Sequence, residues 1–127
     1  MPKKNAVALL VGIVALVACG KGGDAVEPVP VPCSGSVTVS IRPGATPMFS
    51  WTPVCLIDHL IVEATTSGIG DRWAFSGSVA PPVTYGVLPS GATLIRAPEP
   101  LIQGTEYRLV VERTSPPTFL ATQLFRP

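Results

Sequence analysis

Residues 37–52, VTVSIRPGATPMFSWT, decide how this chain folds. On both sides of a Pro-Gly segment, apolar residues alternate with Thr and Ser. This is the pattern of two half-buried β-strands joined by a turn. A hairpin centred on Gly44 places Val37 opposite Trp51 on one face of the sheet. We therefore predict a β-hairpin here, with that face turned toward the core.

The cysteines agree with such a hairpin. The same register places Cys33 opposite Cys55, so the hydrophobic pattern and the cysteine spacing lead to one geometry. In an exported protein such a pair normally forms a disulfide, and closing a loop of about 20 residues would stabilise the domain by about 3 kcal/mol. The alternative is two buried free thiols. A zinc site is not expected, because two cysteines and a single histidine fall short of four ligands.

Downstream of the hairpin, the chain continues as short strands separated by turns. Prolines and glycines recur too often for an amphipathic helix, and β-branched residues dominate the apolar segments. Residues 77–91 form a long irregular passage. Further strands are expected at residues 56–66, 72–75, 93–96, 107–112 and 118–125. Seven strands in about 95 residues predict an all-β fold, a seven-stranded antiparallel β-sandwich.

Residues 101–107, LIQGTEY, lead into the clearest strand of the second half. They resemble the Leu-x-Pro-Gly-Thr-x-Tyr segment of fibronectin type III domains. Leu101, Gly104 and Tyr107 stand at matching positions, and Gln103 replaces the proline. The resemblance implies a tyrosine corner, in which the Tyr107 hydroxyl bonds the backbone upstream.

Residues 49–53, FSWTP, are similar to the second strand of the same family. This similarity implies that Trp51 packs in the core. The family's usual tyrosine is missing from the third strand, and a disulfide between the first two strands is not typical of it. The resemblance covers roughly residues 34–127. It implies a fibronectin type III or immunoglobulin-like sandwich and brings no catalytic residue, because this architecture hosts many functions.

The N-terminus has the features of a bacterial lipoprotein signal. Two lysines precede 13 uncharged, mostly apolar residues (6–18), a run too short for a membrane-spanning helix of about 20 residues. The run closes on Leu-Val-Ala-Cys (16–19), which resembles a lipobox, with cleavage before Cys19 and acylation of its thiol. The alternative is a plain secretory signal. Such a signal prefers a small residue three positions before the cut, where Leu16 stands.

These assignments divide the chain into a signal peptide (1–18), a flexible Gly- and Pro-rich tether (19–32) and a β-sandwich domain (33–127). Palmitate and further acyl chains on Cys19 would hold the domain at a membrane of the cell envelope, since stable anchoring needs more than one chain. Gly20, instead of an aspartate, follows Cys19. The resemblance to sorted bacterial lipoproteins then implies the outer membrane where the cell has one.

Charge and residue types argue against several function classes. Removing the two signal lysines from the 9 basic residues leaves 7 against 8 acidic ones, scattered along the chain, so nucleic acid is not an expected partner. His59 is the only histidine and lies beside Asp58 in a strand pattern. Neither a G-x-S-x-G elbow nor a phosphate loop is present. We expect no enzyme, no metal ion and no cofactor.

Trp73 and Tyr85 are the candidate ligand-binding residues. Exposed aromatic rings stack on sugars or anchor a protein partner, whereas with only 6% aromatic residues both rings are also needed to complete the core. Two functions stay open. In the first, the sandwich displays a surface to another envelope protein. In the second, it binds a carbohydrate or a small extracellular ligand. Exposure of both rings in a groove would favour the second function and their burial the first.

Overall fold

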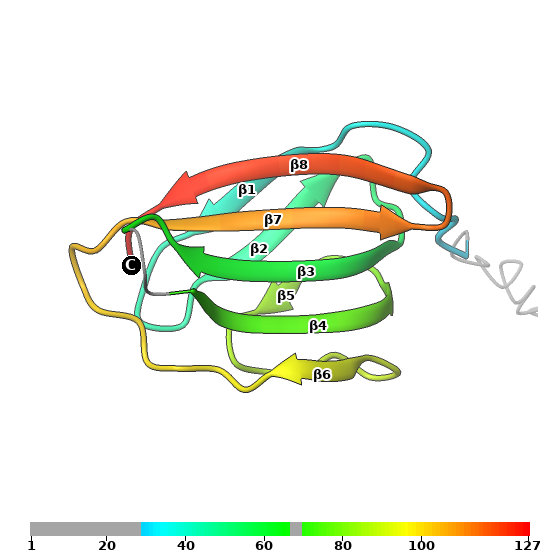
Figure 1. Cartoon of the computed structure of the whole chain (residues 1–127). Coiled ribbons are helices and arrows are strands. Elements are labelled where there is room, and N and C mark those ends of the chain that lie inside the picture. Colours follow the sequence, from blue (N-terminus) through cyan, green and yellow to red (C-terminus); the bar gives the residue numbers. More distant parts are fainter. Residues whose placement is uncertain (1–28, 67–69) are drawn as a thin grey trace, which may run out of the picture.

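The computed structural model describes residues 29–66 and 70–127, so Cys19 and the signal peptide expected before it lie outside the described residues. All regular structure in the described residues is β-structure, in eight strands that form two antiparallel sheets packed face to face (Figure 1). One sheet has the order β1-β2-β5 and the other the order β6-β4-β3-β7-β8. The strands are β1 (Thr38–Arg42), β2 (Met48–Thr52), β3 (Ile57–Ala64), β4 (Asp71–Val79), β5 (Val83–Thr84), β6 (Thr93–Arg96), β7 (Tyr107–Thr114) and β8 (Pro117–Phe125). The fold is the antiparallel β-sandwich expected from the sequence, with eight strands instead of seven.

The eighth strand, β5, lies within the passage that we expected to be irregular, and that expectation was wrong. β5 is two residues long, and its Val83 pairs with Phe49 of β2. The same passage also contains the end of β4, which runs on to Val79. Polar and glycine residues at positions 76–78 hide this part of β4 in the sequence, because they interrupt the apolar alternation.

The hairpin of β1 and β2 forms, but its register differs from the expected one by two residues. Trp51 pairs with Val39 instead of Val37, and the hairpin is centred on Ala45 instead of Gly44. The side-chain period of a strand is two residues, so this shift leaves every side chain on its expected face. Trp51 is accordingly buried, as expected.

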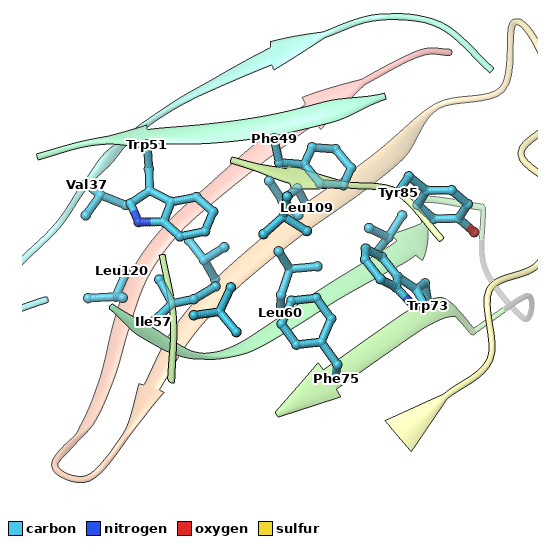
Figure 2. Close-up of a cluster of buried hydrophobic side chains, with 14 of the residues drawn as sticks. Val37, Phe49, Trp51, Ile57, Leu60, Trp73, Phe75, Tyr85, Leu109 and Leu120 are labelled. Carbon is cyan, nitrogen blue, oxygen red and sulfur yellow. The ribbon is translucent and has the colours of Figure 1, made fainter. Parts of the chain in front are cut away.

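The core lies between the sheets and receives side chains from both of them (Figure 2). Leu60 and Val62 of β3 are fully buried, as expected from the alternation in that strand. Phe49 of the smaller sheet packs edge-to-face against Phe125 of the larger sheet, with ring centroids 5.5 Å apart. Such pairs contribute about 0.5–1.5 kcal/mol beyond the burial of their area, so aromatic contacts help to join the two sheets.

The two ends of the sandwich carry different segments (Figure 1). The tether end is formed by residues 31–33, by the β2–β3 connection (53–56) and by the β7–β8 turn (115–116). The far end is formed by the β1–β2 turn (43–47) and by the long β6–β7 connection (97–106). The segment that enters the domain and the β6–β7 connection thus lie at opposite ends of the molecule.

Candidate interaction surface

Cys33 and Cys55 form the expected disulfide, with their Cα atoms 4.9 Å apart. The β1–β2 ladder does not bring them together. Pro32 forms a parallel bridge with Leu56, the Cys33 N–H donates to the Leu56 carbonyl at 2.9 Å, and the Leu56 N–H donates to the Val31 carbonyl at 2.8 Å. The disulfide therefore belongs to a second, parallel pairing beside the start of β3. The bond that we expected is present, but the reasoning from a shared hairpin register was wrong.

Arg113 of β7 strengthens the same junction. Its Nη1 donates to the Cys33 carbonyl at 2.7 Å, and its Nε lies 3.7 Å from Oδ2 of Asp58. Asp58 Oδ2 also accepts a hydrogen bond from the Thr114 N–H at 3.0 Å. We call the disulfide, the Pro32–Leu56 bridge and Arg113 the tether clamp. It fixes where residues 31–33 enter the domain, and no motif in the sequence indicates the role of Arg113.

At the far end, the Tyr107 side chain makes the contact expected of a tyrosine corner. Its ring is buried, and its hydroxyl accepts a hydrogen bond from the Ile102 N–H at 2.8 Å. Gly104 has a φ of 81°, a left-handed conformation that glycine adopts without strain, and this allows the turn before β7. Leu101 packs half-buried against the core. Tyr107 thereby fixes the β6–β7 connection to the sandwich.

Trp73 and Tyr85, the two candidate ligand-binding residues, both lie in the core (Figure 2). They are 0% and 4% exposed, and their rings pack edge-to-face with centroids 5.3 Å apart. The Tyr85 hydroxyl donates to the Glu99 carbonyl, and burial raises the pKa of this phenol to about 12. Neither ring presents a face to solvent, so the burial of both supports the core interpretation.

Glu99, whose carbonyl accepts the hydrogen bond from Tyr85, also forms ion pairs with two arginines. Its carboxylate pairs with Arg72 of β4 and, at the end of β6, with Arg96. The Arg96 and Arg72 guanidinium groups hold the pKa of Glu99 below its ordinary value. This cluster holds the start of the β6–β7 connection in place.

His59 lies on the outer face of the larger sheet, opposite Glu112 of β7, with Nδ1 3.3 Å from Oε2. The neighbouring pair of Glu63 and Arg108 has the same cross-strand arrangement at 3.1 Å. In the described part of the chain, no group of three or more His, Cys, Asp or Glu residues could hold a metal ion. The geometry of His59 is that of a surface pair between neighbouring strands.

A hollow of about 250 Å³ opens at the far end, between the β1–β2 turn and the β6–β7 connection. Its walls are mainly apolar, with one side-chain amide, and consist of Gly44, Ala45, Leu101, Gln103 and Pro127. Ile102, between two of these residues in the chain, is 66% exposed. Pockets for drug-sized ligands usually enclose about 300–1,000 Å³, so a hollow of this size suits one or two side chains of a protein partner better. The sequence pointed to Leu101 only as a structural residue.

Comparison of the chain with protein-family models, curated proteins and solved structures finds no match. Residues 29–66 and 70–127 contain no helix with the length and hydrophobicity of a membrane span. The candidate surface is therefore defined by geometry alone: a clamped entry at one end and an apolar hollow beside an exposed isoleucine at the other.

Proposed function

We propose that this protein is a lipid-anchored lipoprotein of the bacterial cell envelope whose β-sandwich serves as a protein-interaction module. The single observation that carries the interaction role is the placement of the tether clamp and the hollow at opposite ends of the sandwich. A domain held at one end leaves the other end free to contact a partner.

Support for the anchor comes from the sequence. A basic start, an apolar run of 13 residues and the Leu-Val-Ala-Cys tetrapeptide occur in the order of a lipoprotein signal. After Cys19, the Pro-rich part of the tether (27–32) favours an extended chain, at about 3.1 Å per residue. Such a tether would hold the domain about 20 Å from the lipid surface.

Support for a fibronectin type III-like domain comes from the strand pairing and from Tyr107. β7 lies between β3 and β8, as strand F lies between C and G in immunoglobulin-like sandwiches, and β2 lies between β1 and β5. Tyr107 begins β7, where that class carries its tyrosine corner. The disulfide departs from the class, since Cys33 and Cys55 do not join strands B and F. Such sandwiches often act in recognition, which agrees with an interaction module.

The alternative was a module that binds carbohydrate or a small ligand. Its argument depended on Trp73 and Tyr85 as stacking platforms, and both rings are buried. The far-end hollow offers one amide, from Gln103, and otherwise mainly apolar walls. Sugar recognition needs several polar groups as well as an exposed ring, so the protein-interaction role is the better supported of the two.

Site-specific photocrosslinking in intact cells tests the interaction role. A photoreactive amino acid at Ile102 samples the far end, and the same amino acid at Val54 samples the tether end. Position 54 is a matched control for position 102, because the native Val54 side chain is 62% exposed and the native Ile102 side chain is 66% exposed. We expect one discrete adduct with an envelope protein from position 102 and none from position 54. Equal adducts from both positions, or no adduct from position 102, would contradict the proposed role.

A further inference from the structure

Five of the six arginines that the structure describes form an ion pair with an acidic side chain. The paired ones are Arg72, Arg96, Arg108, Arg113 and Arg126. In residues 29–66 and 70–127, Arg42 is the exception and has no such partner. The strands of the smaller sheet, β1, β2 and β5, contain no aspartate or glutamate, so Arg42 is the only charged residue on them.

Arg42 lies beside the far-end hollow. It is the last residue of β1 and stands two residues before Gly44, which lines the hollow. The two Cα atoms are therefore at most about 7 Å apart, a distance that an extended arginine side chain can span. The alternation in β1 turns Val39 and Ile41 toward the core and leaves Arg42 on the solvent side, where it is exposed. A cation without an acidic partner thus stands at the rim of an apolar hollow.

The charge near the other walls of the hollow is balanced. Pro127 lines one of them, and Arg126, the residue before it, pairs with Glu106 at 3.6 Å. Gln103 contributes a neutral amide that can hydrogen-bond the backbone of a bound segment. The unbalanced positive charge therefore lies on the side of the β1–β2 turn.

We propose that the far end binds a segment of a partner protein in which an aspartate or glutamate lies close to an aliphatic residue. The aliphatic side chain occupies the hollow, and the carboxylate pairs with Arg42. A guanidinium group suits this role because it can hold a carboxylate through two N–H groups at once. This inference rests on the proposed interaction role and adds to it the chemistry of the partner.

The acidic residue and the aliphatic residue are both needed for this recognition. An exposed ion pair alone contributes little in water. A purely apolar segment would cover the hollow and remove water from the Arg42 guanidinium without giving it a partner, which is costly. A carboxylate at the rim avoids this cost, and charges so placed act more on the choice of partner than on affinity. Arg42 is therefore the specificity-determining residue of the far end.

The first test is a selection from random linear peptides on the full chain, purified in detergent. We expect the recovered peptides to combine an aliphatic residue with a nearby aspartate or glutamate. On Arg42→Gln, the aliphatic residue should persist and the acidic residue should disappear. The matched control is Arg108→Gln, because Arg108 is an exposed arginine of the larger sheet that already pairs with Glu63. This control should recover the same peptides as the native chain.

Three results of the selection would overturn the proposal. They are a failure to recover any peptide, peptides without acidic residues on the native chain, and the same acidic residues on Arg42→Gln. In the second case, the charge of Arg42 would serve only to keep the edge of β1 from pairing with another chain.

The second test measures binding of one recovered peptide by fluorescence anisotropy, beside the same peptide with amides in place of its carboxylates. We expect the amide peptide to bind the native chain about fivefold more weakly. The two peptides should bind Arg42→Gln equally, because the carboxylate then has no partner to lose. Added salt should weaken binding of the acidic peptide to the native chain but not to Arg42→Gln. A carboxylate effect of equal size in both chains would overturn the pairing with Arg42.

Failure of this inference can be distinguished from failure of the interaction role, because that role is measured separately by the crosslink from position 102. A crosslink in cells without an acidic preference in the peptides would overturn the inference and leave the interaction role standing. Acid-selective peptides without a crosslink would support the chemistry of the far end and contradict the interaction role in cells.

Discussion

The hydroxyl of Tyr107 accepts a hydrogen bond from the Ile102 N–H at 2.8 Å. The bond crosses from the first residue of β7 to the connection that forms one wall of the far-end hollow. Since Tyr107 is 2% exposed, water has little access to this site and cannot easily replace the hydroxyl as the acceptor for the Ile102 N–H. One buried phenol therefore links the stability of the fold to the shape of the candidate interaction surface.

Tyr107→Phe should lower the free energy of unfolding by about 1–3 kcal/mol, because the ring stays packed while the Ile102 N–H loses its partner. Urea unfolding of the purified protein measures the change. Arg108→Lys is the control, since Arg108 is the exposed neighbour on the same strand. If Tyr107→Phe shifts the midpoint no more than Arg108→Lys does, the tyrosine corner contributes nothing.

The Cys33–Cys55 disulfide should stabilise the folded domain by about 3 kcal/mol, because it closes a loop over a sequence separation of 22 residues in the unfolded chain. Replacing both cysteines with alanine should lower the urea midpoint accordingly. Non-reducing peptide mapping of the exported protein should recover both cysteines in one linked fragment. Free thiols at both positions under oxidising conditions would contradict the clamp at the entry of the tether.

Gly77 of β4 has a φ of 137° and faces the chain at Ala92. A Cβ at this position would lie 3.0 Å from the Ala92 Cα and 3.1 Å from the Gly91 carbonyl oxygen. Gly77→Ala should therefore destabilise the domain by about 1–3 kcal/mol through backbone strain and crowding. Gly35→Ala meets no atom within 4 Å and serves as the control. Equal thermal midpoints for the two variants would contradict the close approach at Gly77.

Tyr85 should make the domain sensitive to alkaline pH. Burial raises its pKa from 10.0 to about 12, so between these values the phenol ionises in the unfolded chain and stays protonated in the folded one. The free energy of unfolding should therefore be independent of Tyr85 ionisation below pH 10 and should fall as the pH rises through this window. In Tyr85→Phe, phenolate absorbance should lose its transition near pH 12. A variant with the titration curve of the native protein would contradict the assignment.

The alternation of residues 37–52 was sufficient to predict which side chains face the core, but it could not fix the hairpin register. A shift of two residues preserves both faces, so Val37 and Val39 are equivalent partners for Trp51 as far as the pattern goes. The turn decides between them, and it spans residues 43–47 around Ala45. The disulfide was predicted correctly for a reason that does not hold, since its cysteines meet through the separate Pro32–Leu56 pairing.

The candidate surface was largely beyond prediction from sequence. The hollow combines Gly44 with Gln103, and the tether clamp combines Cys33 with Arg113, so both depend on residues far apart in the chain. Periodicity reports on neighbours along one strand and carries no information on such contacts. Tyr107 was the exception, because a short local motif prescribes both its burial and its backbone partner.

The most direct test of the central claim, a sandwich held at the membrane through Cys19, is mass spectrometry of the N-terminal peptide. The protein is taken from the membrane fraction of cells that express the full chain, with Cys19→Ser as the control. The account predicts a mature chain that begins at Cys19 and carries acyl chains, and a control that is neither cleaved there nor acylated. An unmodified mature terminus in the soluble fraction would contradict it.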